Sequence, residues 1–396
     1  MHMPARPGPG AGGLAKTLST EMMNNPQPPV PSPGFPLDPT KVAPRLLAWY
    51  DRHGRDLPWR RTRDPYRIWL AEIMLQQTTV AAVIPYYQRF LNTFPDLAAL
   101  VAAPLDQVIE LWAGLGYYSR ARNLHRAAQL LVDCHGGRFP ATVAELVALP
   151  GIGRSTAGAI VAIAFDRPAP ILDGNVRRIL VRLFAMAGDP RAAAAERQLW
   201  LWATALTPHD RPHDYTQAIM DLGATLCTPQ LPACPVCPLA ALCLARCQGL
   251  ERQLPAPRVR KTVSVRRQVA VLVDLAGTGT SLARPRPATG FLGGLWELPN
   301  TDLRSDEPPL AAAARLAAEF GLTGAPELVG QLKHAYSHFT LDLALVRISV
   351  AAGCRVAEGE WQWLPAARLQ AVPLHGAHRK ALQRFFAIAA SAGIDG

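Results

Sequence analysis

The sequence has no long hydrophobic run, and no stretch approaches the roughly 18 consecutive apolar residues of a membrane-spanning helix. Its first 40 residues also lack the charged-then-apolar pattern of a secretory signal. These absences argue against a membrane-spanning or secreted protein. We therefore expect a soluble protein of the cytoplasm, in which Met22 or Met23 could be the true start.

Acidic residues are scarce beside basic ones. The 396 residues include 30 Asp and Glu against 41 Lys and Arg, which gives a formal net charge of +11. Such an excess favours a polyanionic partner, with nucleic acid first and an anionic membrane surface second. Charge alone does not identify the partner, because many basic proteins merely stay soluble that way. The hydrophobic fraction of 49% predicts folded domains, and the length allows two or three.

Cysteine is also scarce, except in one short segment. Four of the seven cysteines follow the spacing C-x6-C-x2-C-x5-C, namely Cys227, Cys234, Cys237 and Cys243. Clustered cysteines without a secretory signal favour a metal over disulfides. Four thiolates can hold a tetrahedral zinc or an iron–sulfur cube, and spacing alone does not separate the two. Four unliganded thiols are the weaker alternative.

Composition divides the chain into four parts. Residues 1–40 hold seven prolines between Pro26 and Pro39, so we expect a disordered tail. Residues 41–248 repeat apolar side chains at helical spacing and predict an all-helical domain. Residues 249–264 combine prolines with basic residues, as an exposed linker does. Residues 265–396 predict a smaller α/β domain.

A glycine-rich turn separates two helical patterns. In Leu149-Pro-Gly-Ile-Gly153, the glycines Gly151 and Gly153 allow a sharp reversal that exposes backbone N–H groups at a helix N-terminus. Those groups suit a DNA backbone phosphate. An ordinary helix–helix turn is the alternative, and the turn by itself does not exclude it.

Two carboxylates have contrasting sequence environments. Glu72 lies in the apolar run Ile68–Leu75, where burial would raise its pKa and retain a proton. Asp173 precedes the helical run Val176–Phe184 as an N-cap, which favours the ionised form. One protonated and one ionised carboxyl are the general solution to breaking a glycosidic bond. A solvated Glu and a cap without chemistry are the plainer alternatives.

Three segments, Asp64–Thr78, Gly114–Asn123 and Ile171–Val176, closely resemble the MutY-type adenine DNA glycosylases of the endonuclease III (helix-hairpin-helix) superfamily. The resemblance covers roughly residues 42–248. It implies a monomeric base excision repair enzyme of the bacterial nucleoid that binds double-stranded DNA. It would remove adenine mispaired with 8-oxoguanine or guanine and leave an abasic site. Glu72 would protonate adenine and handle the water, Asp173 would stabilise the sugar cation, and the four cysteines would hold a 4Fe–4S cluster.

The same resemblance assigns further residues. Gln77 and Tyr117 would be wedges beside the flipped base. The adenine pocket would be lined by Trp59, Arg60, Asn175 and Gln217. For Tyr117 and Trp59, packing in the core is the alternative.

Ser155 discriminates between two reaction types within the superfamily. It stands where strand-cleaving members carry the Lys whose amine attacks the sugar. A Ser cannot form a Schiff base, so hydrolysis by water without strand cleavage is implied. Gly151, Gly153 and Ser155 would together belong to the DNA-binding hairpin.

The segment Gly290–Pro299 resembles the opening of a Nudix (MutT-like) domain. In the corresponding box, Ala314–Gly321, only Glu319 remains of the glutamates that hold magnesium, so we expect recognition rather than catalysis. The resemblance places Tyr336-Ser337-His338 in a loop that reads 8-oxoguanine, with Ser337 bonding to the oxidised base. Packing at a strand end is the alternative for Tyr336 and His338.

Three rival functions remain at this point. The nearest is an endonuclease III-like pyrimidine glycosylase with lyase activity, which Ser155 and the additional C-terminal domain count against. A non-catalytic DNA-binding protein with a zinc knuckle is the second. The third is a Nudix hydrolase with a DNA-binding appendage, which the glutamate count disfavours.

Overall fold

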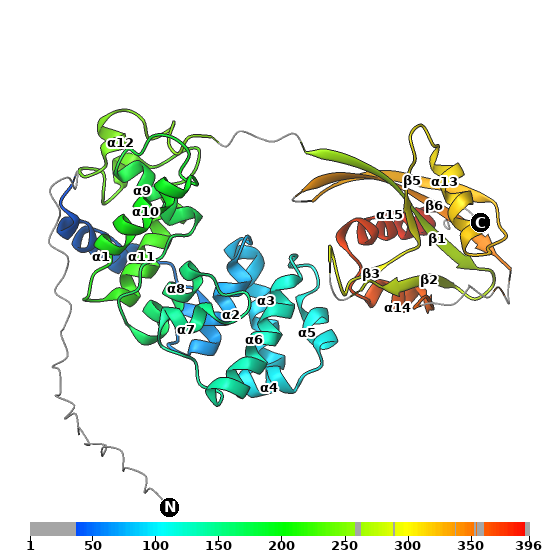
Figure 1. Cartoon of the computed structure of the whole chain (residues 1–396), viewed down its shortest axis with the longest axis horizontal. Coiled ribbons are helices and arrows are strands. Elements are labelled where there is room, and N and C mark those ends of the chain that lie inside the picture. Colours follow the sequence, from blue (N-terminus) through cyan, green and yellow to red (C-terminus); the bar gives the residue numbers. More distant parts are fainter. Residues whose placement is uncertain are drawn as a thin grey trace, which may run out of the picture.

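The computed structural model describes residues 37–257, 263–287, 290–336, 338–351, 354 and 360–392 (Figure 1). A helical half is followed by a half built on a β-sheet, as the composition predicted. Within the described ranges, no helix is both long and apolar enough to cross a membrane.

The helical half begins at the 3-10 helix η1, whose first turn is capped by Asp38 through a 3.0 Å bond from Thr40 N–H. The chain is therefore folded from slightly before the predicted boundary at residue 41. The elements of this half are η1 (Pro39–Lys41), α1 (Val42–His53), η2 (Pro58–Arg60), α2 (Pro65–Leu75), α3 (Val80–Thr93), α4 (Leu97–Ala102), α5 (Leu105–Trp112), α6 (Ser119–His135), α7 (Val143–Val147), α8 (Arg154–Phe165), α9 (Gly174–Leu183), α10 (Ala193–Leu206), α11 (Pro212–Thr225), η3 (Cys234–Val236) and α12 (Leu244–Cys247).

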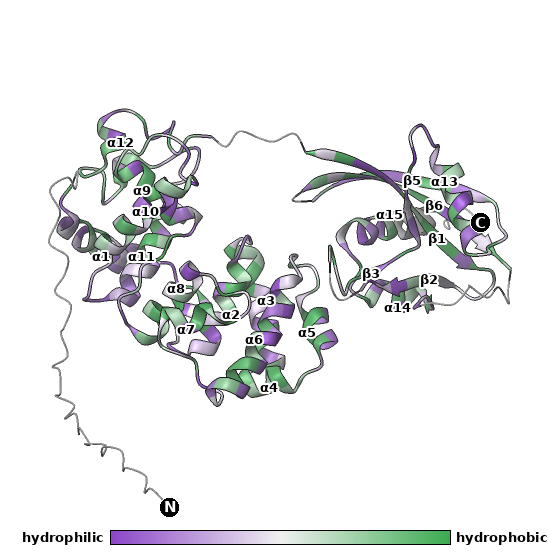
Figure 2. Ribbon diagram, in the orientation of Figure 1, coloured by the Kyte–Doolittle hydropathy of each residue, from purple (hydrophilic) through white to green (hydrophobic). Residues whose placement is uncertain are grey.

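Two hydrophobic cores support these helices. One core is built mainly around α2 to α6, with residues such as Trp69, Phe90 and Trp112. The other joins α1 to α9, α10 and α11. Helices α2 and α8 contribute to both cores, so they lie at the junction of the two lobes (Figure 1). Figure 2 shows hydrophobic residues over much of α4 and α5, and mixed colours along longer helices such as α6, which bury one face.

Glycine allows the closest helix contacts in the second lobe. A Cβ added to Gly223 of α11 would lie 2.5 Å from the Cβ of Asn175 on α9. A Cβ added to Gly158 of α8 would lie 2.4 Å from the carbonyl oxygen of Pro170, just before α9. No other residue fits at either point, and both contacts set the position of the start of α9.

The second half is a mixed sheet with the strand order β3-β2-β1-β6-β5, in which β4 pairs with β1 and β7 with β2. Strands β1 and β6 run parallel, and β5 runs antiparallel to β6. The elements are β1 (Ser264–Leu275), β2 (Thr280–Pro285), β3 (Trp296–Glu297), β4 (Asn300–Asp302), α13 (Pro309–Glu319), β5 (Pro326–Ala335), β6 (Phe339–Val350), β7 (Gln362–Pro365), α14 (Ala366–Ala371) and α15 (Gly376–Ala392).

Both faces of this sheet are covered, which explains the continuous apolar run of β1. Val269, Val271 and Val273 pack with α13 on one face. Ala270 and Leu272 pack with α14 and α15 on the other. A strand buried on both faces is apolar throughout rather than alternating. The predicted linker lies between α12 and β1, and its residues 258–262 fall outside the described part.

Candidate active site

Glu72 stands on α2, at the junction of the two lobes. Asp64 caps this helix by accepting a 2.9 Å bond from Tyr66 N–H, and Pro65 fills its first turn. Almost every neighbour of Glu72 on the helix is buried in a core, whereas Glu72 itself is partly exposed to a cavity. No described residue hydrogen-bonds to its carboxyl group, so both oxygens are available to a bound molecule.

The surroundings of Glu72 keep it protonated. The pKa of Glu72 is raised from 4.5 to about 7, mainly by burial and next by the negative charge of Asp173, against an opposing effect of Arg60. The predicted high pKa is confirmed, and its main cause is the one expected from the apolar sequence. A carboxyl with this pKa can donate and accept a proton near neutrality.

Asp173 is the N-cap of α9, as predicted, and its Oδ1 accepts a 2.7 Å bond from Val176 N–H. The cap was expected to lower the pKa of Asp173, but its net pKa is raised. Burial raises the pKa of Asp173, and the bonds from Val176 N–H and Asn175 N–H, with the charges of Arg178 and Arg177, only partly offset it. The sequence showed the cap but not the depth at which it lies.

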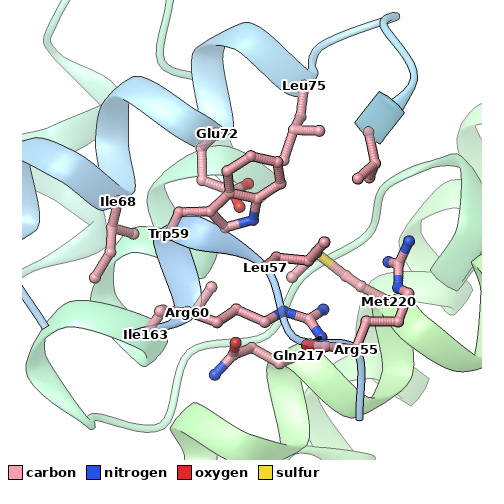
Figure 3. A pocket seen from close by; sticks show the side chains of 11 residues that line it. Arg55, Leu57, Trp59, Arg60, Ile68, Glu72, Leu75, Ile163, Gln217 and Met220 are labelled. Carbon is pink, nitrogen blue, oxygen red and sulfur yellow. Dashed lines mark hydrogen bonds between the residues drawn. The ribbon is translucent and has the colours of Figure 1, made fainter. Parts of the chain in front are cut away.

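The cavity beside Glu72 encloses about 50 Å³, and about 420 Å³ when the open space at its mouth is included. Predicted residues Trp59, Arg60 and Gln217 line it together with Glu72 (Figure 3). Sequence reasoning missed the remaining lining residues, which are Arg55, Leu57, Ile68, Leu75, Val80, Ile163 and Met220. Most of these are ordinary apolar core residues, and no signal in the sequence distinguishes them.

Asn175 does not line this cavity, contrary to expectation. Its side-chain oxygen accepts a 2.8 Å bond from Arg178 Nη2 one turn along α9, and its Cβ packs on Gly223. Arg178 also donates to the carbonyl of Cys227, at 2.7 Å. These contacts occupy Asn175 on the far side of α9. Arg177, Arg178 and Arg182 likewise all bond to protein groups here.

A buried acidic residue that the sequence did not reveal fixes two basic residues of the cavity. Asp221 is fully buried on α11, where its Oδ2 and Oδ1 accept bonds from Arg60 Nη1 and Nη2 at 2.7 and 2.6 Å. Arg55 Nε donates to the same Oδ1 at 2.7 Å. The sequence contains one signal for Asp221: it lies four residues after Gln217, which places the two side chains on one face of a helix.

The glycine-rich turn forms a helix–hairpin–helix between α7 and α8. Gly151 has a φ of +81° and Gly153 directly precedes α8, where both are exposed as a phosphate site requires. Ser155 Oγ accepts a 3.0 Å bond from Leu172 N–H. Ser155 therefore supports the backbone next to Asp173, a role that its sequence position did not suggest.

Two family models match the chain: the HhH-GPD superfamily base excision DNA repair protein over residues 70–204, and the NUDIX domain over residues 269–384. The adenine DNA glycosylase of Rattus norvegicus is 36% identical over 86% of this chain and 77% of its own length. This chain belongs to the adenine DNA glycosylase family. It excises adenine from DNA in base excision repair.

Two further comparisons agree in part of the chain. The adenine DNA glycosylase of Buchnera aphidicola (Acyrthosiphon pisum, strain APS) is 42% identical over 55% of this chain and 63% of its own length. The structure of a thermostable thymine-DNA glycosylase has a TM-score of 0.49 and 28% identity, covering 53% of this chain and 97% of that one.

The predicted wedges of this glycosylase, Gln77 and Tyr117, share an uncommon backbone. Their φ angles are +58° and +50°, in the left-handed region that side chains other than glycine seldom occupy. Tyr117 is 48% exposed, so packing in the core is excluded. Trp59, in contrast, is buried and packs edge-on against Tyr87 while lining the cavity.

One buried arginine holds both wedge loops of the glycosylase. Arg120 on α6 donates to the carbonyls of Gln76 and Gly116, at 2.5 and 3.0 Å, each of which directly precedes one of the two strained positions. It also bonds to Ile73, Met74, Thr78 and Leu115. Burial lowers the pKa of Arg120 only to about 10, so it remains charged. A single side chain thus ties the end of α2 to the loop before α6.

The four predicted cysteine ligands gather over α9. Their thiols are partly buried, and burial together with the other three thiols raises the pKa of Cys237 to about 11. Arg182 Nη1 donates to Cys227 Sγ at 3.2 Å. In the described ranges, no three Cys, His, Asp or Glu side chains converge as tightly as a single metal ion requires. Four thiols that would repel one another when ionised fit a cationic group.

In the Nudix half, the remaining box residue, Glu319, is exposed and pairs with Arg315 Nη1 at 3.6 Å. Arg315 also pairs with Glu307, at 3.0 Å. Tyr336 packs between Phe291 and Phe339, and its hydroxyl lies 3.1 Å from Nδ1 of the buried His375. Packing therefore accounts for Tyr336. Ser337 lies outside the described residues, and His338 is exposed.

Proposed function

We propose that this glycosylase hydrolyses the N-glycosidic bond of adenine mispaired with 8-oxoguanine or guanine, and leaves an abasic site in an intact strand. It would act as a monomer on double-stranded DNA in the cytoplasm, at a bacterial nucleoid. One observation carries the proposal. Glu72 has a pKa of about 7, faces a cavity without a bond to another protein group, and lies within reach of the charge of Asp173.

In the proposed reaction, the protonated form of Glu72 donates one proton and its ionised form later accepts one. Protonated Glu72 donates to a ring nitrogen of adenine as the bond from C1′ of the sugar breaks, and the bonding electrons leave with the base. Ionised Asp173 faces the positive charge that develops on the sugar. The Glu72 carboxylate then takes a proton from the water that attacks C1′, and the carboxyl is restored.

The surrounding residues would position the substrate. Trp59, Arg60 and Gln217 hold the base in the cavity, while Gln77 and Tyr117 fill the space that it leaves in the DNA stack. The hairpin residues Gly151, Gly153 and Ser155 would bind a backbone phosphate. Ser337 would bond to 8-oxoguanine from the Nudix half.

Glu72→Gln tests the assignment directly. This variant keeps the volume of the side chain but cannot transfer the proton, so it should bind a duplex with adenine opposite 8-oxoguanine and release no adenine. Undiminished release would overturn the role of Glu72. Strand nicking by the unmodified protein, without added base, would overturn hydrolysis by water and favour a lyase.

We further propose that Cys227, Cys234, Cys237 and Cys243 hold a 4Fe–4S cluster. When bound, the cluster would tie the loop of residues 227–243 together and can exchange single electrons. Protein isolated without air should show a broad visible absorbance that is lost in Cys237→Ser. Colourless protein containing zinc would contradict the assignment.

We also propose domain limits close to those expected from composition: a tail before η1, a catalytic domain through residue 248, a linker at 249–264 and a recognition domain from residue 265. Limited proteolysis should cut first within the linker. A first cut inside either folded half would contradict these limits.

A further inference from the structure

Two buried polar side chains on successive turns of α11 form a short relay behind the cavity. His213 is 8% exposed and Gln217 is 2% exposed, and only Gln217 lines the cavity. Gln217 Nε2 and His213 Nε2 lie 2.6 Å apart. On its other side, His213 Nδ1 lies 2.7 Å from the carbonyl oxygen of Ile163 at the end of α8.

The Ile163 carbonyl determines the direction of every bond in this relay. A carbonyl oxygen can only accept, so His213 Nδ1 must carry the hydrogen and donate. In a neutral imidazole, Nε2 is then an acceptor. Gln217 must therefore direct its amide nitrogen at His213, because the opposite orientation would bring two acceptors together.

The fixed amide leaves Gln217 Oε1 as an acceptor without a partner. No described group donates to this oxygen, although it is buried. In Figure 3 the oxygen lies on the side of Arg60 and Glu72, and the nitrogen points away from them. A buried acceptor left unpaired costs free energy unless a ligand completes it, so the missing donor is expected from the substrate.

We propose that His213 is a positioning residue that selects for adenine by fixing the orientation of the Gln217 amide. The cavity then offers an acceptor to the 6-amino group of adenine and opposes the 6-oxo group of hypoxanthine or guanine. This inference rests on the proposed placement of adenine in the cavity. Asp214 Oδ1 lies 3.8 Å from His213 Nε2, but Arg211 Nε engages the same side chain at 2.7 Å, so it does not replace Gln217.

His213→Gln tests the relay, because its amide can still bond to Gln217 but accepts or donates equally well. Single-turnover release of adenine and of hypoxanthine is measured on duplexes that differ only at that base. We expect the adenine-to-hypoxanthine rate ratio to fall about tenfold from that of the unmodified protein, the size of one hydrogen bond. His213→Asn serves the same purpose if His213→Gln does not fold.

Gln217→Glu provides the decisive background, because a carboxylate presents only acceptors whatever His213 does. In that background, His213→Gln should leave the ratio unchanged. His125→Gln is the matched control, since His125 is a similarly buried histidine that bonds to the Ala103 carbonyl at 3.0 Å in the other lobe.

An unchanged ratio in His213→Gln would overturn the inference, and so would an equal fall in the Gln217→Glu background. A fall of the same size in His125→Gln would assign the effect to general loss of stability and also overturn it. Failure of the unmodified protein to release adenine would instead refute the function itself.

Discussion

Glu72 gains its chemistry at the expense of folding stability. An unfolded glutamate ionises at about 4.3, whereas the folded protein retains the proton to about 7. Between these values folding takes up a proton, so the contribution of Glu72 to stability is lost as pH rises through that window. Below pH 4 both states are protonated and the residue has no such effect.

Glu72→Gln should therefore stabilise the protein in a pH-dependent manner. Gln cannot ionise, so the variant does not lose the stability that Glu72 costs the protein as pH rises from about 4.3 to about 7. The gain should reach up to about 3 kcal/mol at pH 8, and less where water in the cavity screens the carboxylate. Thermal unfolding of both proteins at pH 8 and near pH 4 measures it. An equal difference at the two pH values would contradict the raised pKa.

Asp221→Asn removes the counter-charge of Arg55 and Arg60. Two guanidinium groups then remain in a buried site with no full partner, and a loss of about 3–5 kcal/mol of stability is expected. The freed charge of Arg60 should also lower the pKa of Glu72 and move the alkaline limb of the pH–rate profile to lower pH. Both quantities follow from single-turnover rates and thermal melts.

Asp56→Asn is the control for Asp221→Asn. Asp56 pairs with Arg61, and both side chains are 69% exposed. Exposed pairs contribute little, so its melting and pH profile should match those of the unmodified protein. Equal effects of the two variants would show that burial does not give Asp221 its importance.

For single residues, the sequence predicted the properties that depend on neighbours in the chain, but not the contacts with residues far away in the chain. The cap at Asp173 and the high pKa of Glu72 follow from neighbours within four residues, and both are confirmed. Asp221 was missed because its partners lie 161 and 166 residues away. The packing of Asn175 was not foreseen for a similar reason, because its neighbour Gly223 belongs to another helix.

Among the elements, the two wedge loops depend on α6 through Arg120. Arg120→Met should release both loops, slow base flipping and lower the single-turnover rate by at least tenfold. A 2-aminopurine placed beside the target adenine reports flipping by its fluorescence. Arg120→Lys, which keeps the charge but fewer donors, should be intermediate.

Arg126→Met is the matched control for Arg120, since Arg126 lies on the same helix and is exposed. It should flip and release adenine normally. Normal flipping by Arg120→Met as well would show that the loops hold their strained conformations without the arginine.

The contact of α9 with α11 allows a second test of how elements position the site. Gly223→Ala would place a Cβ 2.5 Å from that of Asn175, so α9 must shift and carry Asp173 with it. A loss of about 1–3 kcal/mol of stability is expected, with a fall in rate at saturating enzyme. Ala224→Ser, at the exposed neighbouring position, should change neither. A normal rate in Gly223→Ala would show that Asp173 tolerates the shift.

For the whole molecule, the net charge of +11 predicts a strong dependence of DNA binding on salt. Release of counterions should weaken binding to an undamaged duplex at least tenfold between 50 and 200 mM salt. Fluorescence anisotropy measures it. The single-turnover rate of fully bound substrate should change little, because the cavity is shielded from solvent ions. A flat affinity would contradict an electrostatic contact.

The overall architecture was readable from periodicity alone. The sequence predicted an all-helical half followed by an α/β half, and the structure has both in that order. Strand pairing was not readable, because the parallel contact of β1 with β6 joins segments about 75 residues apart and leaves no local pattern. The sequence likewise showed no sign of the cavity between the two lobes.

The strained backbone of Gln77 and Tyr117 has a consequence for evolution and engineering. Glycine at either position would relieve the strain and make the free protein harder to unfold, while removing a side chain that DNA meets. A screen for heat resistance alone would therefore enrich repair-deficient variants at these two positions. Natural selection for DNA repair must therefore retain both residues, although glycine at either position would give a more stable protein.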